Sequence, residues 1–312
     1  MFSFDSGYWA LIIGGSSGFG LACARKLSRH GMNLCIVHRD RKGAMSRIEP
    51  LFDEMRSTGV KVVTFNADAT AAETITRVLD RLEETFARTD RIRLVLHSIA
   101  FGNLRLLAPY HPADTAEKTR ELLARRVALP PEWLDSAVEG LFEEGADALH
   151  PLASPPEYAN DLLLEAGDFA RTIQAMGSNI VEWVQEINQR GLFAEDARVL
   201  SLTSEGNTVA WRGYAAVSAA KAVLESVSRS LAVEFAPYGI RSNVIQAGVT
   251  DTAALRAIPG NRQISARACL RNPFGRLTRP EDVADVIFLL CQDEAAWING
   301  ALICVDGGER IA

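Results

Sequence analysis

Tyr214 and Lys221 are the side chains of this 312-residue chain whose types and spacing best suit catalysis. A separation of seven residues returns nearly to the same face of an α-helix, so both side chains can line one cleft. A phenol placed there could donate a hydrogen bond to an oxygen on which negative charge builds, and a nearby ammonium favours a lower phenol pKa. The pair therefore indicates a site that stabilises an oxyanion, unless Tyr214 is only an aromatic ring packed at a helix start.

A glycine-rich segment follows the first apolar run of the chain and opens a helical pattern. It reads Gly14-Gly15-Ser16-Ser17-Gly18-Phe19-Gly20. Glycines at this spacing let the chain turn tightly and let backbone N–H groups approach a pyrophosphate, to which the helix N-terminus adds its positive dipole end. A position between a strand and a helix strengthens the prediction of a dinucleotide site.

The end of the second apolar run indicates which dinucleotide binds. A 2'-hydroxyl calls for a carboxylate there, whereas a 2'-phosphate calls for arginine. His38 stands where the carboxylate would be, and Arg39 follows it. A guanidinium can bind a phosphate through two hydrogen bonds, so the sequence favours NADPH over NADH. Asp40 could instead pair with an arginine, which would leave only a solvated charged turn.

Apolar runs alternate with helical patterns along most of the chain, which predicts an α/β fold of the Rossmann type with a doubly wound parallel sheet. We expect strands at 8–13, 33–37, 60–65, 92–97, 198–202, 241–245 and 301–305. A long helix is expected at 168–190, and a proline-rich helical insertion at 104–165 interrupts the alternation. The length of the chain fits one Rossmann-type domain, residues 1–312, that carries this insertion at the side of the sheet where ligands bind.

With these motifs the sequence resembles the short-chain dehydrogenase/reductase family, over about 9–101 and from 168 to the C-terminus. Further support comes from Asp68 after the third strand, from 243–252 and from Val305-Asp306-Gly307-Gly308. Within that family it looks most like the divergent NADPH-dependent enoyl-[acyl-carrier-protein] reductases, because of His97-Ser98-Ile99-Ala100-Phe101 and the Tyr-x6-Lys spacing. Ordinary members place tyrosine four residues before the lysine, where this chain has Val217.

The resemblance implies roles for single residues. Tyr214 would stabilise the enolate formed when hydride reaches the β-carbon of an enoyl thioester, and Lys221 would hold the nicotinamide ribose. Ser204 would be an auxiliary hydrogen-bond donor, or only a loop hydroxyl that caps backbone groups. Further cofactor contacts are expected from residues after the third, fourth and sixth strands, namely Asp68, Ser98, Ile99, Ala100, Gly248, Val249 and Thr252.

Two questions stay open at this point. The chain could be a carbonyl or imine reductase of the same family, or a non-catalytic dinucleotide-binding subunit. The insertion could be a lid, a wall of the acyl site or a dock for a carrier protein; equally, it could be a subunit contact. Arg125 and Arg126 within it could meet an acidic acyl carrier, or form a solvated helix face.

The composition limits the kinds of partner and the cellular location that we expect. A net charge of -6 gives no reason to expect nucleic-acid binding, and no apolar run is long enough to cross a bilayer. The first residues lack the basic start of a secretory signal, and the five cysteines show no metal-site spacing. We therefore expect a cytoplasmic protein without a metal. The expected partners are a small-molecule or acyl-thioester substrate and further copies of the chain, in a homodimer or homotetramer.

Overall fold

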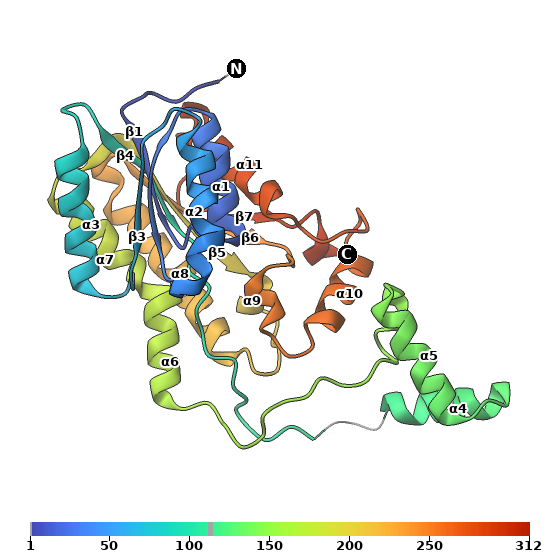
Figure 1. Ribbon diagram of the computed structural model, residues 1–312. Coiled ribbons are helices and arrows are strands. Elements are labelled where there is room, and N and C mark those ends of the chain that lie inside the picture. The colour runs from blue at the N-terminus through green and yellow to red at the C-terminus, as the bar shows by residue number, and fades with distance from the viewer. Residues whose placement is uncertain (1, 112–114) are drawn as a thin grey trace.

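The computed structural model describes residues 2–111 and 115–312, and its centre is a parallel β-sheet with helices on both faces (Figure 1). The seven strands lie in the order β3-β2-β1-β4-β5-β6-β7. In chain order they are β1 (Tyr8–Ile13), β2 (Asn33–His38), β3 (Val62–Asn66), β4 (Arg91–His97), β5 (Phe193–Ser204), β6 (Ile240–Ala247) and β7 (Leu302–Val305). This arrangement confirms the predicted Rossmann-type fold.

Two hydrophobic cores lie on opposite faces of the sheet because successive strand residues point to opposite sides. On β1, Ala10 and Ile12 pack into one core, whereas Leu11 and Ile13 pack into the other. The first core is closed by α1 (Gly18–Arg29), α2 (Met45–Arg56) and α11 (Pro280–Leu290). The second is closed by α3 (Ala72–Thr85), α7 (Asn179–Gln189) and α8 (Ala215–Glu234). The five inner strands are largely buried on both faces, as the continuous apolar runs predicted, whereas the edge strands β3 and β7 are partly exposed.

The helix expected at 168–190 is interrupted. It consists of α6 (Ala166–Ile173), a π-helical segment Gln174–Ser178, and α7. Gly177 lies in the π-helical segment, and a Cβ there would come within 2.9 Å of the Ala220 carbonyl oxygen of α8. The glycine therefore permits close packing against the helix that carries Lys221. Such π-helical turns are frequent at functional sites.

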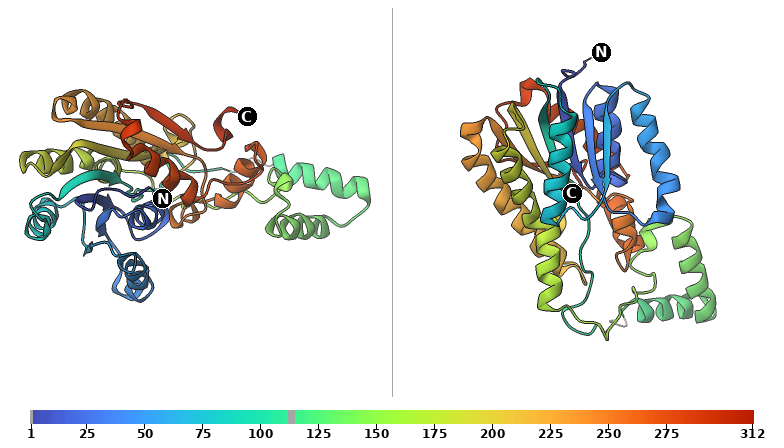
Figure 2. Two further views of the ribbon diagram at one scale, coloured as in Figure 1. Left: turned by 90° about the horizontal axis from the view of Figure 1, so that it is seen from above. Right: turned by 60° about the vertical axis from the view of Figure 1, so that its left-hand side comes forward.

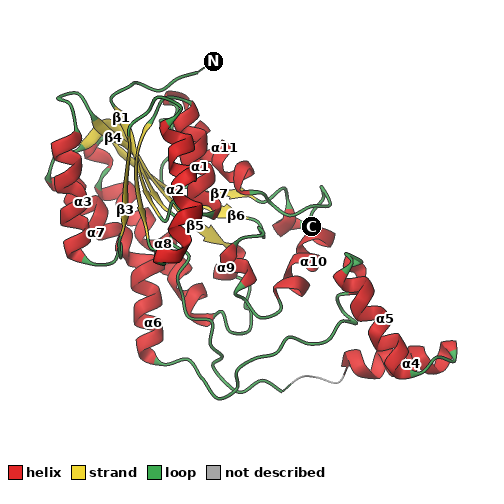
Figure 3. Ribbon diagram, in the orientation of Figure 1, coloured by secondary structure: helices red, strands yellow, loops and turns green. Residues whose placement is uncertain are grey.

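Two helices of the insertion, α4 (Thr115–Val127) and α5 (Pro131–Glu143), stand away from the sheet, and residues 112–114 between β4 and α4 lie outside the described part (Figures 1 and 2). Long loops connect the two helices to the body (Figure 3). The two loops are joined where Leu164 N–H donates to the Leu106 carbonyl at 2.8 Å. Helix α5 ends at Glu143, and a short 3-10 turn, Asp147–Leu149, follows.

The remaining helices, α9 (Ala253–Arg256) and α10 (Asn261–Arg271), follow β6 and lie beside the carboxyl ends of the strands (Figure 1). Among the described residues, every helix is too short or too polar to span a lipid bilayer.

Candidate active site

Two cavities open at the carboxyl ends of the strands, and they share a wall. One is a groove of about 580 Å³ that runs from the glycine-rich turn to Asp68. The other, of about 400 Å³, lies over the ends of β5 and β6 and includes Tyr214 and Lys221. Residues 98–101 and Thr252 line both. A molecule in the groove would therefore extend into the second cavity, as expected at the switch point of a doubly wound sheet.

The glycine-rich turn lies at one end of the groove. At two of its positions a side chain would collide with neighbouring backbone atoms. Gly14 has φ +94°, and a Cβ there would lie 2.6 Å from the Ser98 carbonyl oxygen. A Cβ on Gly20 would collide with the Gly14 carbonyl oxygen. Ser16, Ser17, Gly18 and Phe19 line the groove at the start of α1, where backbone N–H groups are unpaired within the helix. This cradle fits a pyrophosphate.

At the other end of the groove Arg39 and Asp68 face each other. Their ion pair measures 2.9 Å, and the Arg39 guanidinium lies 5.3 Å from the centre of the Phe101 ring. The pKa of Asp68 is lowered, because hydrogen bonds from Thr70 and the charge of Arg39 outweigh partial burial. The Arg39 side chain is 63% exposed and remains available to a ligand.

The carboxylate that could have neutralised Arg39 is occupied elsewhere. Asp40 contacts the buried ring of His38, with 2.8 Å between Oδ2 and Nδ1. His38 fills the place where a carboxylate would bind a 2'-hydroxyl. At this end the groove is therefore lined by the Arg39 guanidinium and by two carboxylates, Asp68 paired with Arg39 and Asp40 bonded to His38.

Tyr214 occupies the N-cap position of α8, and its ring lies against Gly206, where a Cβ would come within 2.5 Å of Cε1. Burial raises the pKa of the phenol, although the neighbouring Ser204 hydroxyl opposes the shift. The phenol therefore keeps its proton at neutral pH and can act as a hydrogen-bond donor. The Ser204 hydroxyl is buried without a hydrogen-bond partner of good geometry among the described residues. Both hydroxyls can therefore donate a hydrogen bond to a ligand oxygen.

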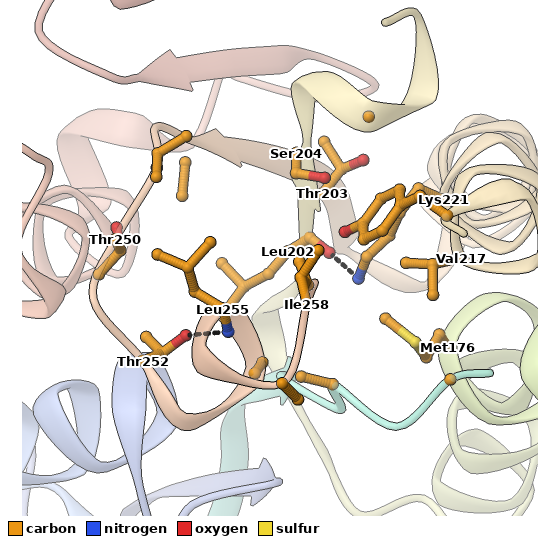
Figure 4. Close-up of a pocket in the computed structure, with 18 of the residues that line it drawn as sticks. Met176, Leu202, Thr203, Ser204, Val217, Lys221, Thr250, Thr252, Leu255 and Ile258 are labelled. Carbon is orange, nitrogen blue, oxygen red and sulfur yellow. Dashed lines mark hydrogen bonds between the residues drawn. The ribbon is translucent and has the colours of Figure 1, made fainter. Parts of the chain in front are cut away.

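Lys221 lies two turns along α8 and is buried. Its ammonium donates to the Leu202 carbonyl oxygen at 2.7 Å (Figure 4), which leaves two further N–H donors for a ligand. Burial lowers the pKa of Lys221 to about 8, although Glu225 opposes the shift. Burial, together with the charge of Lys221, lowers the pKa of His97 to about 3, so this imidazole is neutral. Neither of its ring nitrogens has a well-aligned hydrogen-bond partner within the described residues.

The loop after β6 closes the site from the other side. A Cβ on Gly248 would meet Thr278 Oγ1 at 2.4 Å, so only glycine fits there. In this loop the Val249 N–H donates to Glu309 Oε2 at 3.1 Å. The Thr252 hydroxyl accepts from Leu255 N–H at 3.2 Å and caps α9 (Figure 4). Its proton can still be donated to a ligand.

Three charged residues that the motifs did not indicate hold this loop. Arg271 bonds both carboxylate oxygens of Glu205, at 2.8 and 2.7 Å, and Glu309 Oε1 at 3.0 Å. Glu205 and Glu309 are buried, and burial raises the pKa of Glu309. The cluster links the end of β5 to the C-terminus and, through Val249, to the loop after β6. No local pattern could reveal it, because its members lie far apart in the sequence.

The walls of the 400 Å³ cavity are predominantly apolar. Val217, at the position where ordinary family members carry tyrosine, is buried beside Met176 and Gly102. Leu255, Ile258 and other apolar side chains also line the cavity (Figure 4). Among the described residues of the insertion, Leu104 alone lines the cavity, so α4 and α5 are not a wall of it.

Comparison with known proteins identifies the class. A family model described as "Enoyl-(Acyl carrier protein) reductase" matches residues 14–127 and 149–309. The chain therefore belongs to this family of short-chain dehydrogenases/reductases and is an oxidoreductase.

Relatives with known names are distant and differ in reaction. The chain is 27% identical to the cis-4-hydroxycyclohexanecarboxylate dehydrogenase of Sinomonas cyclohexanicum, over 96% of this chain and 95% of that protein. It is 25% identical to the 1-cyclohexenylcarbonyl-CoA reductase of Streptomyces collinus, over 97% of this chain and 86% of that protein. One relative is thus named for a hydroxyl substrate and the other for an unsaturated thioester.

Solved structures share the fold. A short-chain dehydrogenase from Burkholderia cenocepacia in complex with NADP has a TM-score of 0.69 at 19% identity, and the match covers 97% of this chain and 98% of that one. The enoyl-[acyl-carrier-protein] reductase (NADH) from Aquifex aeolicus has a TM-score of 0.69 at 23% identity, with 98% and 97% covered.

Proposed function

We propose that the protein is an NADPH-dependent reductase of an enoyl thioester. The observation that carries the proposal is the position of Tyr214, which places its protonated phenol and Lys221 in one apolar cavity next to the glycine-rich groove. Val217 at the ordinary tyrosine position cannot supply a phenol. The donor is therefore displaced, which suits a carbonyl oxygen three bonds from the carbon that accepts hydride, whereas in a ketone the oxygen is bonded to that carbon directly.

NADPH, when bound, supplies the hydride. Tyr214 would donate a hydrogen bond to the thioester oxygen while negative charge develops there, and a donor held in a dry site is worth more than one in water. Lys221 would donate to the ribose hydroxyls with the N–H groups that Leu202 leaves free. The apolar walls would exclude water and hold the acyl chain.

The cofactor preference follows from the far end of the groove. Arg39 is exposed toward the groove, and Asp40 is engaged by His38. A 2'-phosphate could replace Asp68 as the partner of the guanidinium or join it. We therefore propose NADPH over NADH.

A second candidate, a carbonyl reductase, is favoured by one specific observation. The Ser204 hydroxyl is buried beside the Tyr214 phenol without a well-aligned partner in the described chain, so the two hydroxyls together could hold a ketone oxygen. The relative from Sinomonas cyclohexanicum, named as a dehydrogenase of a hydroxyl substrate, agrees with this chemistry.

A direct comparison of substrates separates the two candidates. NADPH oxidation is followed by loss of its ultraviolet absorbance with crotonyl-coenzyme A and with acetoacetyl-coenzyme A, and the product is identified by mass spectrometry. We expect turnover of the crotonyl thioester to the saturated butyryl thioester. Turnover of the acetoacetyl thioester alone would establish the carbonyl reductase instead. Repeating the assay with crotonyl-[acyl carrier protein] tests which carrier is preferred.

A further inference from the structure

The helices α4 and α5 form a hairpin that projects from the body of the molecule, and residues 115–143 are called the insertion hairpin here (Figures 1 and 2). Its attachment is narrow. Arg262 of α10 pairs with Asp147 at 2.7 Å and lies 4.4 Å from the centre of the Phe142 ring. Arg120 of α4 pairs with Asp135 of α5 at 2.7 Å and fixes the two helices to each other.

The insertion hairpin has an inner face that is already packed. Val138 and Phe142 of α5 and Ala124 of α4 are buried, and Phe142 packs with Ala266 of α10. The inner face therefore accounts for the stability of the hairpin and for its docking on α10.

Its outer surface carries several large apolar side chains among its charged ones. Trp133 and Leu141 of α5 are 69% and 50% exposed, and Ala137 lies between them at helical spacing. On α4, Leu123 and Val127 are 39% and 53% exposed and also four residues apart. Exposed apolar residues grouped in this way, with tryptophan among them, are typical of protein–protein contacts.

Charge is divided between the two helices. Helix α5 carries four acidic residues and no basic one: Glu132, Asp135, Glu139 and Glu143. Helix α4 carries four basic residues and two acidic ones: Lys118, Arg120, Arg125, Arg126, Glu117 and Glu121. Arg120 of α4 and Asp135 of α5 form an ion pair across the two helices. Helix α4 is thus net basic and helix α5 is acidic, although Arg120 is only 11% exposed and Arg125 is paired with Glu121.

We propose that the insertion hairpin is a self-association surface, occupied by the insertion hairpin of a second copy of this chain. Under a two-fold axis every contact occurs twice, so α4 of each copy can face α5 of the other and the basic helix can meet the acidic one. The exposed apolar side chains would then fill the centre of a four-helix contact, with the charges at its rim.

An acidic carrier protein fits the same surface less well. It would be attracted to Arg125 and Arg126 but repelled by the acidic residues of α5. The self-contact uses both helices and both charges. It also leaves the cavity lining free, because neither α4 nor α5 contributes to it. The proposal is therefore independent of which substrate the enzyme reduces.

Sedimentation equilibrium of the whole protein tests the proposal. The double variant Trp133→Glu with Leu141→Glu removes the apolar centre without touching the packed inner face. We expect its dissociation constant for the hairpin-mediated step to rise at least ~10-fold, the usual cost of losing a tryptophan anchor. Cofactor affinity should not change, which checks that the fold survives.

Charge reversal supplies a matched control. Arg125→Glu with Arg126→Glu should weaken association, and so should Glu132→Arg with Glu143→Arg. A chain that carries all four reversals should associate again, because attraction between the helices is restored with its sign exchanged.

Three results would overturn the proposal. They are a sedimentation mass unaffected by the apolar variant, a four-fold reversal that does not restore association, and a native protein that stays monomeric at high concentration. If other faces also assemble, the hairpin variants should still lower the mass by one association step. If an acidic partner protein bound the basic helix, and the sedimentation mass of this protein alone were unaffected by Trp133→Glu, that partner would be the alternative occupant.

Discussion

At the amino-terminal edge of the sheet, the guanidinium groups of Arg93 and Arg198 are fully buried, and each is surrounded by oxygen atoms. Arg93 donates to the Cys291 carbonyl, and Arg198 to the Leu290 carbonyl, at the end of α11. Asp196 pairs with both guanidiniums. At the carboxyl edge, Lys221, His97 and Ser204 are also enclosed, but their polar atoms are only partly paired. The first arrangement joins the sheet to a helix, whereas the second keeps bonding capacity for a ligand.

The difference shows that burial of charge has two separate uses in this fold. Buried polar groups that are fully satisfied restrict the chain to one structure, and groups that are left partly unsatisfied cost stability but can bind. Substitutions at the two edges should therefore affect different quantities.

The largest effect is expected at the amino-terminal edge. Asp196→Ala would leave two buried guanidiniums close together without their shared carboxylate. We expect a loss of about 3 kcal/mol in the free energy of unfolding, the lower end for breaking a buried ion pair, because Asp196 is itself 28% exposed. Chemical denaturation measures it. Asp293→Ala is the control, since Asp293 also pairs with Arg93 but is 89% exposed and should cost less than about 1 kcal/mol.

Lowering the pH of the native protein should also remove the stability that the Asp196 carboxylate contributes. Hydrogen bonding and charge from Arg198, with the charges of Arg93 and Arg241, outweigh burial and lower the pKa of Asp196. Its contribution is thus fully present above the ordinary carboxyl pKa and is lost as pH falls through the lowered value. Equal acid sensitivity of the native protein and Asp196→Ala would contradict this assignment.

At the carboxyl edge, chemistry should change and stability should not. Tyr214→Phe keeps the ring against Gly206 and removes one hydrogen-bond donor. We expect the turnover rate to fall roughly 100-fold or more, the usual effect of losing one oxyanion donor. NADPH affinity, measured by calorimetry, should stay within about twofold of the native value, and Tyr238→Phe at an exposed position should leave both quantities unchanged. Full turnover by Tyr214→Phe would remove the main support for the enoyl reductase.

The pH dependence of kcat/KM should report the protonation of Lys221, which lies at the same edge of the sheet. Its pKa of about 8 is below the ordinary lysine value, so the ammonium is lost as pH rises through about 8 in the ligand-free protein. We expect kcat/KM to fall about tenfold per pH unit above this value, because ribose binding and phenol polarisation both depend on the charge. Lys221→Arg stays protonated and, if active, should lose this decline. His97, neutral with a pKa of about 3, should add no step near pH 6.

The sequence predicted the sheet and the location of the site because both depend on local patterns. Buried strands read as apolar runs, and the turn itself requires Gly20, where a side chain would collide with the Gly14 carbonyl oxygen. The enclosing charges could not be predicted in this way. Arg271 meets Glu205 and Glu309 only after folding, and the π-helical turn at Gln174–Ser178 depends on packing against α8.

The smallest effect is expected at the outer end of the groove, where charge is exposed. Arg39→Ala should weaken NADPH binding about tenfold, the scale of one hydrogen bond to a charged group, and should change NADH affinity by less than about twofold. The reason is that a 2'-phosphate would take up the guanidinium now shared with Asp68, whereas a 2'-hydroxyl gains little from it. Arg41→Ala, nearby but outside the groove lining, is the matched control. Calorimetry with both cofactors measures the ratio. Equal losses for both would show that Arg39 only organises Asp68 and Phe101, and equal native affinities would refute the preference for NADPH.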